Sequence, residues 1–320
     1  MTHPLFLRLA SRSGIIWLLA IVACVGLAAA VVSASGPSKV AVVQQVVKPV
    51  SGPPAGYSAS LTFTEEFDGP VLDPLRWQTT YADPADPSPK ITKRNLWNNR
   101  EKQVYVDRGF LGLAIDPFDF EDGVLIIEAR PLSAAARNAL AAELGRLPEN
   151  LRSTSFSKLG YSSGMISSRG RFAQRYGYFE MRARWSAGKG LWPAFWLLPE
   201  DGSWPPEIDV LEAHGDKRNA SFHSLHLSQG RSTTRRAKVP LDDREFHTFG
   251  ALWLPDRIDY FVDGLKVATI PIPEDIDKPM FLVANLAIGG AWPGDPDETT
   301  HFPARLEIDH IRVWSIEPMP

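Results

Sequence analysis

The sequence contains a single cysteine, Cys24, among 320 residues, so the chain cannot close a disulfide within itself. A large buried core must therefore hold it together, and a hydrophobic content of 44% can supply one. A dominant basic stripe is also missing. The net charge of −3 gives no reason to expect a nucleic-acid partner.

Acidic residues are absent from the N-terminal region, since Glu65 is the first in the chain. Arg8 and Arg12 precede the apolar run 14–32, which is the order typical of an export signal. As a helix this run of 19 residues would be about 28 Å long, enough for an uncleaved membrane anchor. Cleavage after Ala34 would instead release the protein, and the sequence Ile-Val-Ala-Cys ending at Cys24 resembles a lipoprotein box.

All three alternatives place the C-terminal bulk outside the cytoplasm. We therefore expect residues 1–34 to be a signal peptide or membrane anchor, with membrane association through residues 14–32 if they are retained. The expected location is periplasmic or extracellular, either released or anchored. Residues 35–57 are rich in Ser, Pro, Gly and Val, which indicates a linker. No second linker or repeat follows, so residues 58–320 should form one domain, and we expect a monomer.

This domain is dominated by short apolar or alternating runs rich in β-branched and aromatic residues, which predict strands. The clearest runs are 123–130, 176–185, 246–254, 257–264 and 304–314. Asp263-Gly264 predicts a tight turn with a strand on each side. Many short strands with few helical periods favour an all-β sandwich of antiparallel sheets. Residues 133–147 are an Ala/Leu/Glu run that predicts a short helical insertion, either packed against a sheet edge or bounding a cleft.

Three carboxylates, Glu207, Asp209 and Glu212, are crowded into six residues of an otherwise apolar strand. Alternation places Glu207 and Asp209 on one face, whereas Glu212 falls out of phase. One extra residue at Val210-Leu211, forming a β-bulge, would bring Glu212 back to that face. The two glutamate Cα atoms would then lie about 13 Å apart. Their carboxyl groups could approach to about 5–6 Å, near the separation of a retaining glycosidase pair.

Retaining chemistry needs one ionised carboxylate as nucleophile and one protonated carboxyl group as acid and later base. Negative neighbours raise the pKa of a carboxyl group, so the crowding itself predicts the tuning. The alternative is an exposed edge strand with solvated acids, or a metal site. The apolar gaps between the acids favour catalysis. His214, His223 and His226 follow the strand, but without a Cys or H-E-x-x-H pattern they do not predict a catalytic metal.

The segment "EIDVLE" resembles the active-site signature of glycoside hydrolase family 16 in its β-bulge form. The stretches "FTEEFDG" (63–69), "NREKQVYVD" (99–107), "YGYFEMRARWSAGKGLWPAFWLLP" (176–199) and the sequence from Phe281 to Trp314 resemble other segments of that family. The resemblance covers the domain from about Leu61 and implies a concanavalin-like β-jelly-roll with a concave substrate face. It implies Glu207 as nucleophile, Asp209 as its helper and Glu212 as acid/base, an order that the strand argument leaves open.

The resemblance also implies substrate contacts for Asn99, Trp192, Trp196, His226 and Trp292. For the two tryptophans of "GLWPAFWLLP" a core position remains the alternative, and for His226 a backbone hydrogen bond. Trp292 lies in a Gly-rich loop, where a sugar contact is favoured. Ala291 stands where the family commonly has Asn, and Arg100 beside Asn99 would suit an anionic substrate.

Many family members hold a structural Ca²⁺ on the convex side, and the matching positions are Glu66, the carbonyl of Gly123 and Asp309. Oxygen ligands of this kind suit Ca²⁺. Asp309 has an alternative role as a capped strand residue.

The resulting hypothesis is a cofactor-independent, retaining endo-β-glycanase. Its expected partner is a polysaccharide, either an acidic exopolysaccharide such as succinoglycan or a β-1,3 or mixed-linkage glucan. The alternatives are a non-catalytic carbohydrate-binding protein and a transglycosylase on the same fold. The three acids argue against the binding protein, whereas the sequence does not exclude the transglycosylase.

Overall fold

A computed structural model describes residues 51–83, 90–149, 158–228, 230–239, 241, 245–272 and 276–319. The expected signal or anchor, including Cys24 and residues 14–32, and the linker up to residue 50 lie outside these described residues. None of the helices in the described part is both long and apolar enough to cross a membrane. Ser51 and Gly52, within the expected linker, bind the carboxylate of Glu180 on strand β8 (Gly177–Trp185).

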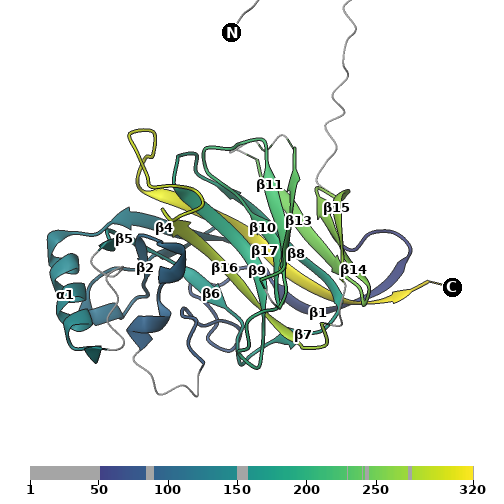
Figure 1. Cartoon of the computed structure of the whole chain (residues 1–320), viewed down its shortest axis with the longest axis horizontal. Coiled ribbons are helices and arrows are strands. Elements are labelled where there is room, and N and C mark those ends of the chain that lie inside the picture. The colour runs from purple at the N-terminus through teal and green to yellow at the C-terminus, as the bar shows by residue number, and fades with distance from the viewer. Residues whose placement is uncertain are drawn as a thin grey trace, which may run out of the picture. The chain divides into compact units, whose positions relative to one another are not determined.

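Two sheets form the body of the domain, as the alternating runs predicted (Figure 1). The larger sheet has the order β15-β14-β13-β8-β17-β4-β5-β2, with β1 paired to β17 and β3 to β4. Its strands are β1 (Tyr57–Glu65), β2 (Gln103–Tyr105), β3 (Phe118–Glu121), β4 (Val124–Pro131), β5 (Tyr161–Ser163), β8 (Gly177–Trp185), β13 (His247–Trp253), β14 (Arg257–Val262), β15 (Leu265–Pro271) and β17 (Ala304–Pro318).

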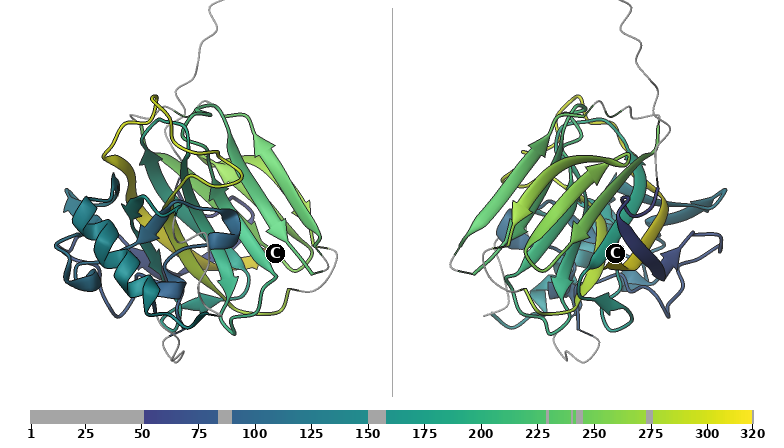
Figure 2. Two further views of the ribbon diagram at one scale, coloured as in Figure 1. Left: turned by 60° about the vertical axis from the view of Figure 1, so that its left-hand side comes forward. Right: turned by 90° about the vertical axis from the view of Figure 1, so that its right-hand side faces the viewer.

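The smaller sheet has the order β12-β11-β10-β9-β16-β6, with β7 paired to β16. Its strands are β6 (Met165–Ser167), β7 (Ala173–Gln174), β9 (Leu191–Pro199), β10 (Glu207–Glu212), β11 (Ser221–His226), β12 (Ser232–Ala237) and β16 (Met280–Ile288). The two sheets stack as layers (Figure 2). The strand pairs of the described residues are antiparallel except β2 with β5, so the predicted all-β sandwich is confirmed with one parallel pair.

The main core fills the space between the sheets with apolar side chains from both layers. Phe179 and Phe249 come from the larger sheet, and Phe195, Ile208 and Leu282 from the smaller one. All five are buried. Burial of this many large apolar side chains supplies the stabilisation that a disulfide-free domain requires.

The turn predicted at Asp263-Gly264 is a two-residue hairpin, because Val262 and Leu265 are register partners in β14 and β15. Both turn residues have positive φ, 50° for Asp263 and 78° for Gly264. Hairpins of this length prefer turns with two positive φ values, which Asp and Gly tolerate best.

The predicted helical insertion is the α-helix α1 (Ala134–Gly145), seen beside β2 and β5 in Figure 1. Ser133 caps its N-terminus by accepting a hydrogen bond from Ala136 N at 3.1 Å. Ala136 and Leu140 pack into a second apolar cluster with Val104 of β2. No α1 residue lines the cleft described below, so the helix packs against a sheet edge. The remaining described helices are short 3₁₀ turns at Lys90–Lys93, Trp97–Asn99 and Phe110–Gly112.

Candidate active site

A cleft of about 960 Å³ lies on the face of the smaller sheet that points away from the core. Its floor is formed by β9, β10, β11, β12 and β16, and its rim by residues 92, 93, 95–99, 101 and 202–204 and by Trp292. Every substrate residue expected from the sequence lines this cleft: Asn99, Trp192, Trp196, His226 and Trp292. The three acids of β10 line it as well.

The β-bulge predicted in β10 is present. Asp209 pairs with Trp196 of β9 and Glu212 with Ala194, so two intervening β10 residues, Val210 and Leu211, face Phe195 alone. Ile208, Val210 and Leu211 are all fully buried in the main core. The extra residue therefore turns Glu212 to the cleft face that Glu207 and Asp209 occupy.

Each glutamate accepts a hydrogen bond from its own indole. Trp204 Nε1 donates to Glu207 Oε2 at 2.7 Å, and Trp192 Nε1 donates to Glu212 Oε1 at 3.0 Å. The two carboxyl groups therefore have different hydrogen-bond donors, although both belong to strand β10. The tryptophans come from different segments, a rim loop and β9.

Asp209 lies between the two glutamates in sequence and is 2% exposed. His226 Nε2 lies 3.0 Å from Asp209 Oδ2 and 3.8 Å from Glu207 Oε1. His226 is opposite Glu207 in the β10–β11 ladder. The imidazole therefore forms a hydrogen bond with Asp209 and lies beside Glu207.

Burial raises the pKa of all three carboxyl groups, because the charged form loses water. The nearby carboxylates of Asp209 and Glu207 add to the effect at Glu212, whose pKa is well above its usual range. At Glu207 the rise is opposed by His226 and by the hydrogen bond from Trp204. Burial is therefore a larger cause than the crowding expected from the sequence. Crowding adds to the rise at Asp209 and Glu212, whereas the hydrogen bond with Asp209 lowers the pKa of Glu207.

Aromatic side chains line both ends of the acid row. Trp192 and Trp292 pack edge to face with ring centroids 5.2 Å apart. Trp196 is 7% exposed and donates its N–H to Asn285 Oδ1 at 2.7 Å. It lines the cleft and also packs in a small apolar cluster. Apolar ring faces beside polar groups suit sugar rings, which carry C–H faces and hydroxyl edges.

Asn99 ends a 3₁₀ turn at the rim, and its side chain donates to Glu101 Oε1 at 3.2 Å. Its carbonyl oxygen accepts a hydrogen bond from Ala291 N at 2.8 Å, which ties this turn to the loop that carries Trp292. Arg100 has a left-handed backbone, is exposed, and is not among the residues that line the cleft.

The cleft residues that were not predicted include Phe222 and Ser224 of β11 and Asn285 of β16. Extending strand alternation backward from His226 would have found Ser224 and Phe222. No such signal existed for Asn285, because all nine residues of β16 are buried and its sequence shows no polar alternation.

The three histidines do not gather. His223 is fully buried and contacts the carbonyl oxygen of Val210 at 2.8 Å, whereas His214 contacts Lys217 Nζ at 2.7 Å. Within the described residues, the group close enough to share an ion is Glu207, Asp209 and His226. Hydrogen bonding within the acid row accounts for that group without an ion.

The two carboxylates expected to bind Ca²⁺, Glu66 and Asp309, are each paired with an arginine. Arg312 contacts both oxygens of Glu66 at 2.7 Å, and this guanidinium holds the pKa of Glu66 at about 2. Arg182 lies 3.0 Å from Asp309 Oδ2, which also contacts His310. Gly123 lies beside residues 66–68 as expected. Both carboxylates are already neutralised by arginine, so the expected calcium site is not supported.

Comparison with known proteins agrees with this geometry. The chain is 37% identical over 225 residues to the endo-1,3-1,4-beta-glycanase ExsH of Rhizobium meliloti (strain 1021), covering 69% of this chain and 45% of that protein. It is 30% identical to a beta-glucanase of Rhodothermus marinus, covering 79% of this chain and 84% of that protein. The chain thus spans less than half the length of the first relative.

The fold matches the laminarinase catalytic domain of Thermotoga maritima MSB8 with a TM-score of 0.63 at 30% identity, covering 80% of this chain and 98% of that one. The family model of the glycosyl hydrolases family 16 matches residues 130–312, which include β10 and the acid row. The match spans more than half of the chain. This chain belongs to the glycosyl hydrolases family 16.

Proposed function

We propose that this chain is a retaining endo-β-glycanase that hydrolyses β-glucosidic bonds inside a polysaccharide. The observation that carries the proposal is the bulged strand β10, which presents Glu207, Asp209 and Glu212 to one cleft with a separate indole on each glutamate. The relatives that act on 1,3-1,4-linked or other β-glucans support this substrate class.

In the first step Glu212, kept protonated by burial, donates its proton to the leaving glycosidic oxygen. Glu207, ionised and oriented by Trp204 and His226, attacks the anomeric carbon and forms a glycosyl-enzyme ester. The C–O bond to the leaving sugar breaks as the bond to Glu207 forms. Asp209 shares a hydrogen bond with Glu207 and helps to set which of the two holds a proton.

In the second step Glu212, now ionised, takes a proton from water, and the hydroxyl attacks the anomeric carbon. The ester to Glu207 breaks, and the product keeps the β configuration. The mechanism requires no cofactor. A sugar hydroxyl in place of water would give transglycosylation through the same residues.

We further propose that the protein is exported and acts as a monomer on a β-1,3 or mixed-linkage glucan or on an acidic exopolysaccharide such as succinoglycan. The N-terminal charge and apolar pattern supports export. The cleft supports a polymeric substrate, because it is open and crosses five strands of the smaller sheet.

The test is reducing-end release by the purified chain on mixed-linkage β-glucan, laminarin, xyloglucan and succinoglycan. Glu207→Gln and Glu212→Gln should each remove activity on whichever polymer is cleaved, while leaving the fold intact by circular dichroism. Cleavage that survives in either variant would contradict the assigned roles. If the chain binds a polymer as tightly as both variants and cleaves none, it is a carbohydrate-binding protein. Added acceptor oligosaccharide would reveal transglycosylation as longer products.

A further inference from the structure

A row of side chains crosses the smaller sheet from the catalytic acid to the sheet edge. Glu212 of β10 is the register partner of Phe222 of β11, and Phe222 is the partner of Arg236 of β12. Register partners in adjacent strands point to the same face. Phe222 and Glu212 line the cleft, and Arg236 projects from the same face of the sheet, just beyond the residues that line the cleft. Two strand spacings place its Cα about 10 Å from that of Glu212.

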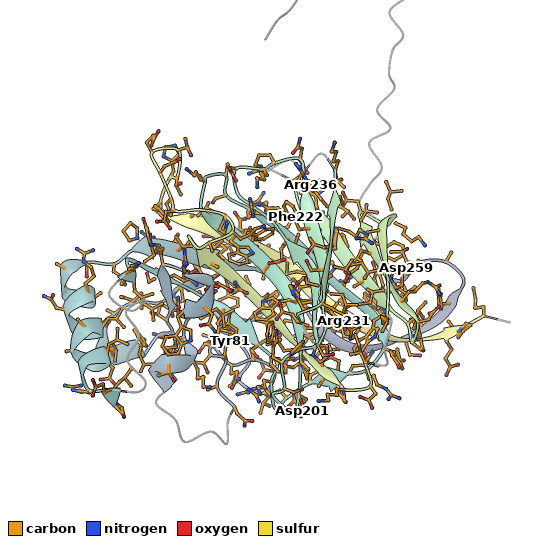
Figure 3. All side chains as sticks on the ribbon, in the orientation of Figure 1. Tyr81, Asp201, Phe222, Arg231, Arg236 and Asp259 are labelled. Atoms are coloured by element: carbon orange, nitrogen blue, oxygen red, sulfur yellow. The ribbon has the colours of Figure 1, made fainter. Side chains whose placement is uncertain are left out.

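The guanidinium of Arg236 lies 5.9 Å from the centroid of the Phe222 ring, and Figure 3 shows the two side chains next to each other. Lys217 Nζ lies 5.9 Å from the same ring. Two cations therefore flank one aromatic ring at this end of the cleft. Asp216, beside Lys217 in the same turn, adds one negative charge.

Arg236 has no ion pair with any residue in the described part of the chain, in contrast to three arginines on other elements. Arg94, Arg169 and Arg305 each contact a carboxylate within 3.1 Å. Arg236 is exposed, and its guanidinium lies over the ring of Phe222. Its five N–H donors are thus available to a ligand that lies over Phe222.

An edge strand can carry charge simply to prevent pairing with another chain, and β12 is the edge of its sheet. Arg235 serves that purpose equally well, since it is exposed on the same strand. Successive strand residues point to opposite faces, so Arg235 lies on the face away from the cleft. Edge protection therefore does not explain a second arginine in the row of the catalytic acid.

We propose that Arg236, together with Lys217, forms an anion subsite at the β12 end of the cleft that binds a carboxylate carried by the sugar lying over Phe222. A guanidinium matches the two oxygens of a carboxylate and forms paired hydrogen bonds to it. The aromatic ring beneath packs against the sugar and excludes water, which strengthens the charge interaction. The inference rests on the proposed function and narrows its substrate class to acidic β-glycans.

The test compares mixed-linkage β-glucan with the same glucan after a small fraction of its primary hydroxyls is oxidised to glucuronate. The wild type should show a kcat/KM about fivefold or more higher on the oxidised polymer at low salt, with the gain lost at high salt. In Arg236→Gln the ratio of kcat/KM on the oxidised polymer to kcat/KM on the unoxidised polymer should be close to the wild-type ratio at high salt. Arg235→Gln removes the same charge from the other face and should keep the wild-type ratio.

A wild type without preference for the oxidised polymer would overturn the proposal. Equal loss of preference in both arginine variants would also overturn it, because the effect would then come from overall charge.

Calorimetric binding of the two polymers to Glu207→Gln separates this proposal from the proposed function. One outcome is that the wild type cleaves neither glucan, while Glu207→Gln binds the oxidised glucan more tightly and loses this preference when Arg236→Gln is added to it. That outcome would reject the hydrolase and retain the anion subsite. If both glucans are cleaved but bound equally well, the hydrolase stands and the anion subsite is rejected.

Discussion

Trp192 donates its indole N–H to Glu212 Oε1 across 3.0 Å, and this bond lowers the pKa of a carboxyl group that burial raises strongly. A hydrogen bond to the ionised form favours ionisation, so it works against the role of Glu212 as an acid. The structure thus balances two demands on one residue, which must hold a proton in the first step and release it before the second.

The pH profile follows from this balance. Activity should fall at low pH when Glu207 becomes protonated and at high pH when Glu212 ionises. Both pKa values are raised, so the active range should lie above the ordinary carboxyl value of 4.5. Trp192→Phe removes a bond that lowers the pKa of Glu212, and the alkaline limb of kcat/KM should therefore move to higher pH.

The matched variant is Trp204→Phe, which removes the hydrogen bond that lowers the pKa of Glu207. The pKa of Glu207 should rise, and the acidic limb should move to higher pH while the alkaline limb stays. Both profiles are measured as kcat/KM on a soluble oligosaccharide. If Trp192→Phe moved the acidic limb and Trp204→Phe the alkaline limb, the roles of the two glutamates would be exchanged.

The order of the glutamates has its own test, since strand geometry alone does not establish it. With an activated aryl glycoside and azide, Glu212→Ala should regain activity and form the β-azide, because the glycosyl-enzyme still forms on Glu207 and the azide needs no base. Without azide its rate should be about 10²–10⁴-fold below wild type. Glu207→Ala should give the α-azide by direct attack. The reverse pattern of products would exchange the two roles.

The long strands were predictable because alternation and β-branched content mark a half-buried sheet. The predicted run 304–314 is β17, which extends to Pro318, and the run 257–264 contains β14. The three-residue strands β2, β5 and β6 were not predictable, since three residues are too few to show a period. Their pairing depends on tertiary contacts, including the apolar cluster beneath α1.

The acid row was predictable for a different reason. Apolar residues at Val210 and Leu211 must both be buried, and only an extra residue allows this while keeping Glu212 at the cleft. Sequence could not supply the indole bonds, because Trp204 reaches Glu207 from a loop. Arg236 was also missed: its strand, "STTRRA", has no apolar alternation that would identify a cleft face.

The convex side gives a prediction about calcium. Because Arg312 and Arg182 already neutralise Glu66 and Asp309, removing calcium with a chelator should leave the melting temperature unchanged. Added Ca²⁺ should likewise give no shift, since an ion that binds the folded state would raise stability with its concentration. Scanning fluorimetry with EDTA and with CaCl₂ measures this. A melting temperature that falls with EDTA and recovers with Ca²⁺, but not Mg²⁺, would establish the ion.

Glu101 lies under the cleft rim, 3% exposed, with Gln103 Nε2 at 2.6 Å and Asn99 Nδ2 at 3.2 Å. Burial raises the pKa of this carboxyl group from 4.5 to about 7. The folded state therefore binds the proton more tightly than the unfolded state does. Between these two pH values the free energy of unfolding should fall as pH rises, by up to about 3 kcal/mol from this residue.

Glu101→Gln cannot ionise, so it should remove this part of the pH dependence. We expect the variant to be about as stable as wild type at pH 4.5 and clearly more stable at pH 8, where wild-type Glu101 carries a buried charge. Urea unfolding at both pH values measures the difference. Glu143→Gln on α1, a partly buried surface carboxylate paired with Arg146, is the control and should leave the pH dependence as in wild type. A variant less stable than wild type at pH 8 would contradict this expectation. It would mean that the hydrogen bonds from Asn99 and Gln103 to the ionised carboxylate stabilise the fold by more than burial of the charge destabilises it.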